Sequence, residues 1–395
     1  MTPRVSDVYI ENYKSIAQVH TTLAPFTALV GPNGAGKSNF IDCLAFVQEC
    51  LSDSVELAFK NRGGIAAVRR RSGGHPTHIG VRLGLVLDEE LTAEYAFRIA
   101  AKPRERFSVA RERCVLRRLM APEVAFDVRH GEFHQPIPDI RPRISADRLA
   151  LFAASATEEF RPVYDFLTSM RFYSVEPGRL RELQDPDPGD SLKRDGSNAA
   201  AVLKRLAEVD GKEGRYERVC QLLSKVVEGL EKVEYRAVGQ KETLEFRQDV
   251  GLKHPWRFAP LSMSDGTLRV LGLLLAVYQP GAQSLVAIEE PEATVHPAVS
   301  ELVVQVLLDA AEDRQVVVTT HSPDILDDKE LGDTQLRAVI TEENRTLVCP
   351  VSGATRDAIR EQLYTPGELL RSGELNPDAE LAKRQAQEHR LFSPR

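Results

Sequence analysis

The sequence predicts an α/β fold, in which a mixed sheet with flanking helices carries an added antiparallel β-subdomain and an inserted helical domain. Residues 31–38 spell Gly-Pro-Asn-Gly-Ala-Gly-Lys-Ser, a GxxxxGK[S/T] loop between an apolar run and a helical pattern. Strand and helix patterns alternate again over 261–323, as in a parallel core sheet. Between 77 and 128, apolar and polar residues alternate instead, which is typical of an antiparallel sheet.

Composition and length limit the class of protein. A chain of 395 residues is long enough for one large domain plus an insertion or a second domain. Its hydrophobic content of 42% and charged content of 28% are those of a soluble globular protein. Neither an apolar run of about 18 residues nor a signal-peptide core is present, so no membrane span is expected. The five scattered cysteines disfavour a disulfide framework and predict a cytoplasmic protein.

The N-terminal region builds up to the phosphate loop. A strand hairpin is expected over 8–16 and 18–22, followed by a buried strand over 26–30. Gly34 and Gly36 let the backbone curl so that its N–H groups face phosphate oxygens, and the start of the next helix adds partial positive charge. Lys37 is expected to reach the β- and γ-phosphates and the Ser38 hydroxyl to bind Mg²⁺. An ordinary glycine-rich turn is the weaker alternative, since the flanking strand and helix both suit a nucleotide site.

Basic residues cluster in the predicted antiparallel sheet and just after it. A nucleic-acid-facing stripe is one interpretation. The interleaved Glu105 and Glu112 favour the other, a salt-bridged exposed face. The net charge of −7 argues against a protein that coats nucleic acid with its whole surface. The cluster comprises Lys102, Arg104, Arg106, Arg111, Arg113, Arg117, Arg118, Arg141 and Arg143.

Helical spacing returns in the middle of the chain, over 144–171, and again over 199–207 and 216–230. The last twenty or so residues are charged and short of large apolar groups, so a loose, partly disordered tail is expected there. These patterns predict four parts: residues 1–130 with the phosphate loop and the antiparallel subdomain, 131–232 as the helical insertion, 233–350 as the second part of the nucleotide-binding head, and 351–395 as the C-terminal segment.

Two buried strands in the C-terminal third are followed by side chains that could bind metal or take part in catalysis. The strand over 284–288 runs into Glu289 and Glu290, which suits a Mg²⁺-shell carboxylate followed by one that orients or deprotonates a water. His321 follows the strand over 315–320, where its imidazole can hydrogen-bond a γ-phosphate. Surface glutamates and a satisfied core histidine are the plainer alternatives. Ligands of open α/β sheets lie at the carboxyl edge, which favours the catalytic interpretation.

Several of these segments resemble the motifs of ABC-class ATPases. The stretch Ser264-Asp-Gly-Thr-Leu-Arg269 resembles the signature, and Ile288-Glu-Glu-Pro-Glu292 with His296-Pro297 resembles the Walker B strand and D-loop. Thr320-His-Ser-Pro323 resembles the switch histidine motif. Ile10-Glu-Asn-Tyr-Lys-Ser-Ile16 is similar to the opening strand of a soluble branch that holds RecF, SMC and OLD-like AAA-family ATPases, which often lie beside effectors in bacterial defence operons.

The resemblance implies an ABC-type P-loop ATPase head that works as a dimer. Two heads would pack head to tail, each ATP lying between one phosphate loop and the signature helix of the other copy. Lys37, Glu290 and His321 would be catalytic, and Ser38 and Glu289 would bind Mg²⁺. The residues that would contact nucleotide are Lys14, Ser15, Asn33, Gly34, Ala35, Gly36, Lys37, Ser38, Asn39, Ser264 and Gly266.

We therefore predict a slow, dimeric or higher-order ATPase that gates a separate effector, such as a nuclease, or a DNA contact in bacterial defence or DNA maintenance. Only 73 residues follow Ser322, too few for the Toprim nuclease domain of some OLD proteins, so any nuclease is expected on another chain. A RecF-type repair protein that binds DNA structures is the alternative. An ABC transporter subunit is disfavoured by the signature and by the lack of a recognisable Q-loop.

Overall fold

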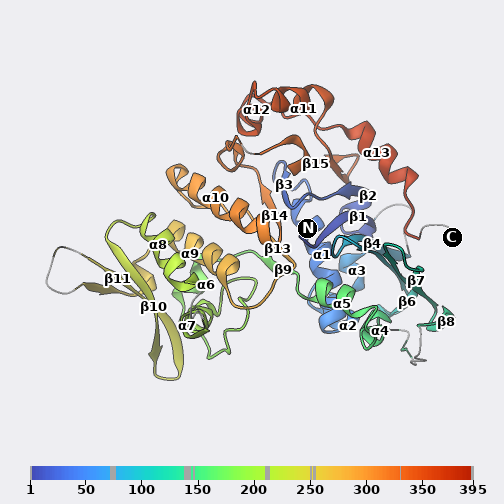
Figure 1. The fold of residues 1–395 in the computed structure, drawn as a ribbon, viewed down its shortest axis with the longest axis horizontal. Helices are drawn as coiled ribbons and strands as arrows, with labels where there is room; N and C mark the ends of the chain where they lie inside the picture. The colour runs from blue at the N-terminus through green and yellow to red at the C-terminus, as the bar shows by residue number, and fades with distance from the viewer. Residues whose placement is uncertain are drawn as a thin grey trace.

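The computed structural model describes residues 2–71, 77–137, 144–145, 147–209, 214–249, 251, 255–329 and 331–392. Its centre is a six-stranded mixed sheet, which we call the core sheet (Figure 1). A lobe of helices and a small sheet projects to one side of it. A seven-stranded antiparallel sheet, the outer sheet, lies on the other side, and the C-terminal helices run along the top of the molecule in this view.

The core sheet brings the three predicted functional strands together. Its order is β16-β15-β3-β14-β13-β9, and all neighbours are parallel except β15 and β16. Val30 pairs with Thr320, and Glu289 pairs with Thr319, so β3, β14 and β13 end at the same edge. The strands are β3 (Phe26–Val30), β9 (Arg171–Tyr173), β13 (Leu285–Glu289), β14 (Gln315–Thr320), β15 (Leu336–Glu342) and β16 (Arg345–Cys349).

Different helices cover the two faces of the core sheet. Strand side chains alternate between faces: Leu29 packs with the helices α1 and α5, whereas Ala28 and Val30 pack with α9 and α10. The parallel strands are therefore buried on both faces, which explains their continuous apolar runs. The covering helices are α1 (Lys37–Ser52), α5 (Arg161–Thr168), α9 (Asp265–Tyr278) and α10 (Pro297–Asp313).

The outer sheet confirms the predicted opening hairpin and antiparallel subdomain. Its order is β2-β1-β4-β5-β6-β7-β8, with every neighbouring pair antiparallel. The strands are β1 (Arg4–Tyr13), β2 (Ile16–Thr22), β4 (His78–Val86), β5 (Leu91–Ala101), β6 (Phe107–Arg118), β7 (Val124–Arg129) and β8 (Glu132–Gln135). Short helices α2 (Val55–Lys60) and α3 (Ile65–Val68) follow α1.

The single helix expected over 144–171 is instead two helices, α4 (Leu151–Ala154) and α5. Pro162 lies in the first turn of α5, where its missing N–H costs nothing, and it starts a new helix there. β9 then joins the edge of the core sheet.

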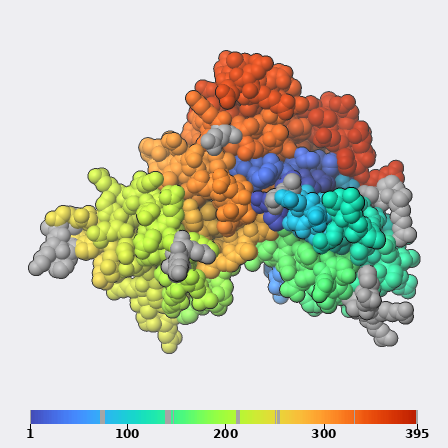
Figure 2. Space-filling model, viewed as in Figure 1, coloured from blue at the N-terminus to red at the C-terminus, as the bar shows by residue number. Residues whose placement is uncertain are grey.

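The inserted lobe, residues 177–258, packs against α9 and projects from the core (Figure 2). Its second long helix ends at Ser224 rather than near Leu230, because Gly229 (φ 74°) turns the chain into a strand. The elements of this lobe are α6 (Pro177–Arg181), α7 (Ala199–Val209), α8 (Arg215–Ser224), β10 (Leu230–Val238), β11 (Lys241–Gln248) and β12 (Trp256–Phe258).

The C-terminal segment differs from the loose tail expected for it. Helix α13 (Ala379–Glu388) packs on β2 and β16, and the Gln18 Nε2 donates a hydrogen bond to the Ala386 carbonyl (2.6 Å). Beyond it, Leu391 is 2% exposed and packs with Tyr9 and Ala96 on the outer sheet. The composition of the segment could not reveal this, because one leucine and one phenylalanine suffice when a matching surface receives them. The remaining elements are η1 (Pro260–Ser262), η2 (Pro323–Leu326), η3 (Asp333–Gln335), α11 (Gly353–Arg360) and α12 (Pro366–Ser372).

Two members of the basic cluster are salt-bridged at the surface. Arg111 binds Asp127 (2.7 Å) and Arg117 binds Glu123 (3.1 Å), which confirms that interpretation for these side chains. Glu112 does not belong to that surface, because it is buried and accepts hydrogen bonds from the Leu151 N–H and the Tyr95 hydroxyl. Arg141 and Arg143 lie outside the described residues.

No helix in the described part of the chain is long and apolar enough to cross a membrane. All five cysteines are free thiols in buried positions. Burial raises the pKa of the Cys43 and Cys50 thiols well above the usual value, which makes them unreactive.

Candidate nucleotide-binding site

The phosphate loop joins β3 to α1 at the carboxyl edge of the core sheet. Gly36 has φ 104°, a conformation that favours glycine, and a Cβ there would lie 2.1 Å from the Thr346 Oγ1. The same hydroxyl donates a hydrogen bond to the Ala35 carbonyl (2.9 Å). Strand β16 therefore braces the loop from outside, and only glycine fits at the point of contact.

Lys37 is folded back into its own loop. The residue is 5% exposed, and its Nζ donates to the Gly31 carbonyl (2.6 Å) and the Pro32 carbonyl (3.2 Å). Burial lowers the pKa of Lys37, and the carboxylates of Glu290 and Glu292 oppose that effect. Among the other predicted loop residues, Asn33, Gly34 and Ser38 are exposed, and the Asn39 Nδ2 donates to the Ser15 Oγ (2.6 Å).

The structure brings the predicted catalytic pair together. Glu290 follows β13 with φ 44°, and its Oε1 lies 3.5 Å from the Nδ1 of His321, which follows β14. The two side chains are 37% and 46% exposed, so both can meet a ligand. Glu289 is engaged differently: its Oε1 accepts a hydrogen bond from the Arg194 Nη2 at 2.7 Å.

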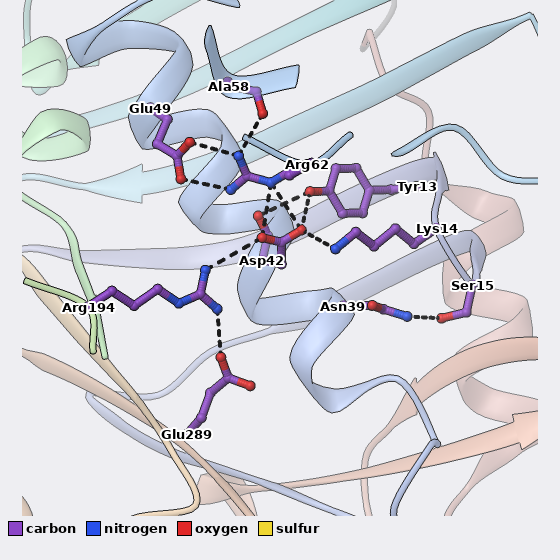
Figure 3. Close-up of polar contacts among 10 residues, drawn as sticks. All are labelled: Tyr13, Lys14, Ser15, Asn39, Asp42, Glu49, Ala58, Arg62, Arg194 and Glu289. Atoms are coloured by element: carbon purple, nitrogen blue, oxygen red, sulfur yellow. Dashed lines mark hydrogen bonds and ion pairs between the residues drawn. The ribbon is translucent and has the colours of Figure 1, made fainter. Parts of the chain in front are cut away.

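Lys14 lies in the turn between β1 and β2, and its side chain contacts α1 rather than the phosphate loop (Figure 3). Its Nζ is 2.6 Å from the Asp42 Oδ2, and the Tyr13 hydroxyl donates to the same oxygen at 2.6 Å. Arg62 binds Asp42 from the other side at 3.0 Å. Burial by itself would raise the pKa of Asp42, but Arg62 and Lys14 hold it below its usual value. Asp42 is thus an ionised carboxylate near the phosphate loop that binds Lys14, Tyr13 and Arg62.

The predicted signature residues begin the helix α9. Ser264 is the N-cap of α9, and its Oγ accepts a hydrogen bond from the Thr267 N–H (3.1 Å). Gly266, in the first turn, approaches the Thr294 carbonyl so closely that a Cβ would lie 2.7 Å from it. α9 and α1 cover opposite faces of the core sheet, and the Ser264 hydroxyl is bound to Thr267 of its own helix.

Sequence reasoning missed two side chains that hold the site together. The Arg269 Nη2 of α9 donates to the Glu290 carbonyl (2.8 Å), and its Nη1 donates to the Val175 carbonyl. The Glu292 Oε1 accepts from the Thr320 Oγ1 (2.5 Å), while the Thr320 carbonyl accepts from the Gly31 N–H (3.3 Å). Burial raises the pKa of Glu292. Arg269 and Glu292 both lie within recognised motifs, but only the strand register shows which residues they contact.

The residues present suit a magnesium nucleotide. The Ser38 hydroxyl and the Glu289 carboxylate are oxygen ligands of the kind Mg²⁺ prefers. Within the described ranges, no group of three or more His, Cys, Asp or Glu side chains could hold a metal without other ligands. A magnesium ion here would need phosphate oxygens as well, which is its usual manner of binding at nucleotide sites.

Residues 26–327 match the protein family described as "AAA domain, putative AbiEii toxin, Type IV TA system". The match spans more than half of the chain. The chain belongs to this AAA family.

The fold of this AAA chain is similar to that of solved SMC head domains. An Smc head bound to the C-winged helix domain of ScpA superposes with a TM-score of 0.51 at 16% identity, covering 89% of this chain and 98% of that one. The SMC head domain from Thermotoga maritima gives a TM-score of 0.46 at 16% identity, covering 88% of this chain and 99% of that one. The first likeness shows the fold of an ABC-type ATPase head, as predicted.

Similarity to curated proteins is local. The chromosome condensation protein dpy-27 of Caenorhabditis elegans is 51% identical over 47 residues, and structural maintenance of chromosomes protein 1 of the same organism is 52% identical over 40 residues. These stretches are 11% and 10% of this chain. They cover 3% of the length of each of those relatives.

Proposed function

We propose that this chain binds and slowly hydrolyses ATP in sites that two copies complete head to tail. The observation that carries the proposal is the division of the site between the two faces of the core sheet. Lys37, Glu290 and His321 gather at its carboxyl edge, whereas Ser264 opens α9 on the opposite face from α1. A second copy related by a twofold axis would bring its α9 to the first copy's phosphate loop.

Each side chain then has a defined task. Lys37 would exchange the Gly31 and Pro32 carbonyls for phosphate oxygens, and the backbone N–H groups around Gly34 would surround the same phosphates. Ser38 and Glu289 would hold Mg²⁺, which supplies positive charge to the phosphates when bound. Glu290 would accept a proton from the attacking water as the bond from the γ-phosphorus to the bridging oxygen breaks. His321, 3.5 Å from Glu290, would donate a hydrogen bond to the γ-phosphate.

The second copy would contribute from the start of α9. A helix N-terminus offers unpaired N–H groups and a partial positive charge to an anion. Ser264 would add its hydroxyl and Gly266 its N–H to the γ-phosphate. Asn33, Ala35, Gly36 and Asn39 would stay with the copy that holds the nucleotide. Lys14 and Ser15 would join them, although Lys14 would first have to leave Asp42.

We propose further that the dimer acts as a switch on a separate protein, in the cytoplasm and in bacterial defence or DNA maintenance. Two observations support a protein partner: the family is described as a putative toxin of a type IV TA system, and the solved Smc head is bound to a domain of ScpA. Direct DNA binding has less support. The Arg98 and Arg111 side chains of the outer sheet already pair with Glu11 and Asp127.

The replacement Glu290→Gln tests the proposal. Without a general base the variant should bind ATP, fail to release phosphate and accumulate as a dimer, which sedimentation velocity would show as an ATP-dependent rise in mass. Glu312→Gln, an exposed position at the end of α10, should behave like the unaltered protein. Nucleotide bound without any change in mass would refute the head-to-tail site, and absence of nucleotide binding would refute the ATPase itself.

A further inference from the structure

Arg194 connects the inserted lobe to the two carboxylates beside the phosphate loop (Figure 3). Its Nη2 lies 2.7 Å from the Glu289 Oε1, and its Nη1 lies 3.8 Å from the Asp42 Oδ1. Glu289 ends β13 and Asp42 lies on α1, so one guanidinium spans two elements on which the site is built. No sequence motif pointed to this arginine.

The backbone of Arg194 is anchored where the core sheet ends. Tyr173 of β9 pairs with Ile288 of β13, which places Ser174 beside Glu289. The Ser174 N–H donates to the Arg194 carbonyl (2.8 Å), and the Glu176 N–H donates to the Asp195 carbonyl (3.0 Å). The main chain at Arg194 thus continues the edge of the sheet beyond β9, and its side chain reaches one strand inward.

The guanidinium is the most solvent-accessible member of this group. Its side chain is 45% exposed, whereas those of Glu289 and Asp42 are 14% and 10% exposed. Asp42 also pairs with Lys14 and Arg62. A long, half-exposed side chain can change partner without disturbing the packing around the two carboxylates.

We propose that Arg194 is the resting counter-ion of Glu289 and gives up this carboxylate when Mg²⁺ binds with the nucleotide. The inference rests on the proposed function, because it takes Glu289 as a magnesium ligand. A divalent cation on Glu289 would lie within a few ångströms of the guanidinium and repel it strongly. Asp42 is already close to the Nη1, so the displaced side chain has an anionic partner on α1.

The backbone around Arg194 is connected to the signature helix α9 through Val175. The segment that anchors its backbone includes Val175, whose carbonyl accepts from the Arg269 Nη1 of α9. Gly272 of α9 packs so closely on Val175 that a Cβ would lie 2.4 Å from its Cγ1. Residues 174–176 therefore contact both the backbone that carries Arg194 and the helix that the second copy would meet. Arg194 is a positioning residue in this scheme.

Competition between the guanidinium and the metal makes the test direct. In the Glu290→Gln background, binding of a fluorescent ATP analogue would be measured at fixed nucleotide while Mg²⁺ is titrated. Arg194→Ala should lower the Mg²⁺ concentration at half-saturation by about fivefold, the scale of a half-exposed ion pair. For Arg194→Lys, which keeps the charge, the Mg²⁺ concentration at half-saturation should lie between those of Arg194→Ala and the protein with Arg194. Binding of the analogue in EDTA should be unchanged.

Arg205→Ala is the matched control, since Arg205 lies in the same lobe with a similarly exposed side chain and pairs with Asp190. It should leave the Mg²⁺ titration unaltered, and the melting temperatures of all variants should agree. An unchanged or raised Mg²⁺ requirement in Arg194→Ala would overturn the inference while leaving the ATPase proposal intact. Failure of the Glu290→Gln protein to bind the analogue at any Mg²⁺ concentration would instead refute the proposed function.

Discussion

The guanidinium of Arg111 lies over the ring of Phe392, 4.2 Å from its centroid. The two residues are far apart in the sequence. They meet because the C-terminal segment packs on the outer sheet. The Arg82 Nη1 donates to the Arg390 carbonyl (2.6 Å), and Leu391 fills a slot beside Tyr9. The end of the described chain therefore contributes to folding stability rather than trailing in solvent.

Replacement of Leu391 by alanine should lower the free energy of unfolding by about 2 kcal/mol, the lower range for a buried leucine. Its side chain lies on a sheet surface rather than in the deep core, so the surroundings can partly relax. Urea unfolding would measure the change. Leu363→Ala, at a site that is 62% exposed, should stay within about 0.5 kcal/mol of the unaltered protein. Equal effects at both positions would show that the segment is not docked.

Gly80→Ala should weaken the same contact from the sheet side. A Cβ at Gly80 would lie 2.6 Å from the Leu391 Cδ2 and from the Glu11 Cγ. We expect a loss of about 1–3 kcal/mol in urea unfolding, as for other overpacked sites. Combined with Leu391→Ala, which removes one clashing group, the cost should be less than the sum of the two. Simple additivity would contradict a direct contact.

The phosphate loop offers a matched pair of glycines. Gly34 and Gly36 have φ values of 80° and 104°, so alanine at either would incur the left-handed backbone cost of about 1–2 kcal/mol. Only Gly36→Ala adds a clash with Thr346, because a Cβ at Gly34 would meet nothing within 4 Å. Gly36→Ala should therefore be the less stable variant in urea unfolding. Equal losses would mean that β16 does not brace the loop.

A composite site predicts complementation between two inactive variants. Lys37→Ala removes the phosphate contact of one half-site and Ser264→Ala the hydroxyl of the other. A mixed dimer would still contain one site with both residues intact, so phosphate release should reappear when the two proteins are mixed. Each variant incubated alone is the control. Activity that stays absent in the mixture, with ATP-dependent dimers present, would place both residues in the same half-site.

Glu112 gives the folded protein a specific pH dependence. Burial raises its pKa from the usual carboxyl value to about 7, against three stabilising hydrogen bonds. The folded state therefore binds a proton that the unfolded state releases between about pH 4.5 and pH 7, so stability falls as pH rises through this window. Each pH unit is worth about 1.4 kcal/mol, which limits the loss to about 3 kcal/mol.

Comparison with Glu112→Gln isolates that contribution. The neutral amide cannot titrate. The unfolding free energy of the variant, relative to that of the unaltered protein, should therefore rise between pH 5 and pH 8. Urea unfolding at both values measures the difference. The carboxyls of Asp42 and Asp127 act in the opposite sense, since their pKa values are lowered by arginine partners and their stabilisation disappears only in acid. A constant difference between the two proteins would mean that Glu112 stays ionised.

Local patterns predicted much of this protein. The loop around Lys37 and the strands that end at Glu289 and at Thr320 appear where the sequence indicated. These features depend on short-range chemistry: apolar periodicity, glycine conformations and caps that act within a few residues. The resemblance to ABC-class ATPases rested on the same short segments; the family match shows an AAA domain, and the structural likeness shows the ABC-type head fold.

The patterns were least informative where one element packs on a distant one. Pro162 divides a helix that apolar spacing alone had made continuous, and Leu391 docks a segment whose composition suggested disorder. For Leu391 the deciding partner is far away in the sequence, whereas Pro162 acts within its own turn. Composition reports how much apolar surface a segment has, but the surface that will receive it is set by the fold.

The sequence by itself determined that a phosphate loop, a pair of carboxylates and a histidine follow three buried strands, because each motif is built from neighbouring residues. The tertiary structure decided which of the distant residues are in contact. It set Arg194 on Glu289, Lys14 on Asp42 and α9 on the face opposite α1, since these pairings join residues far apart in the chain. They follow from strand register and from which face each helix covers, and neither can be obtained from local periodicity.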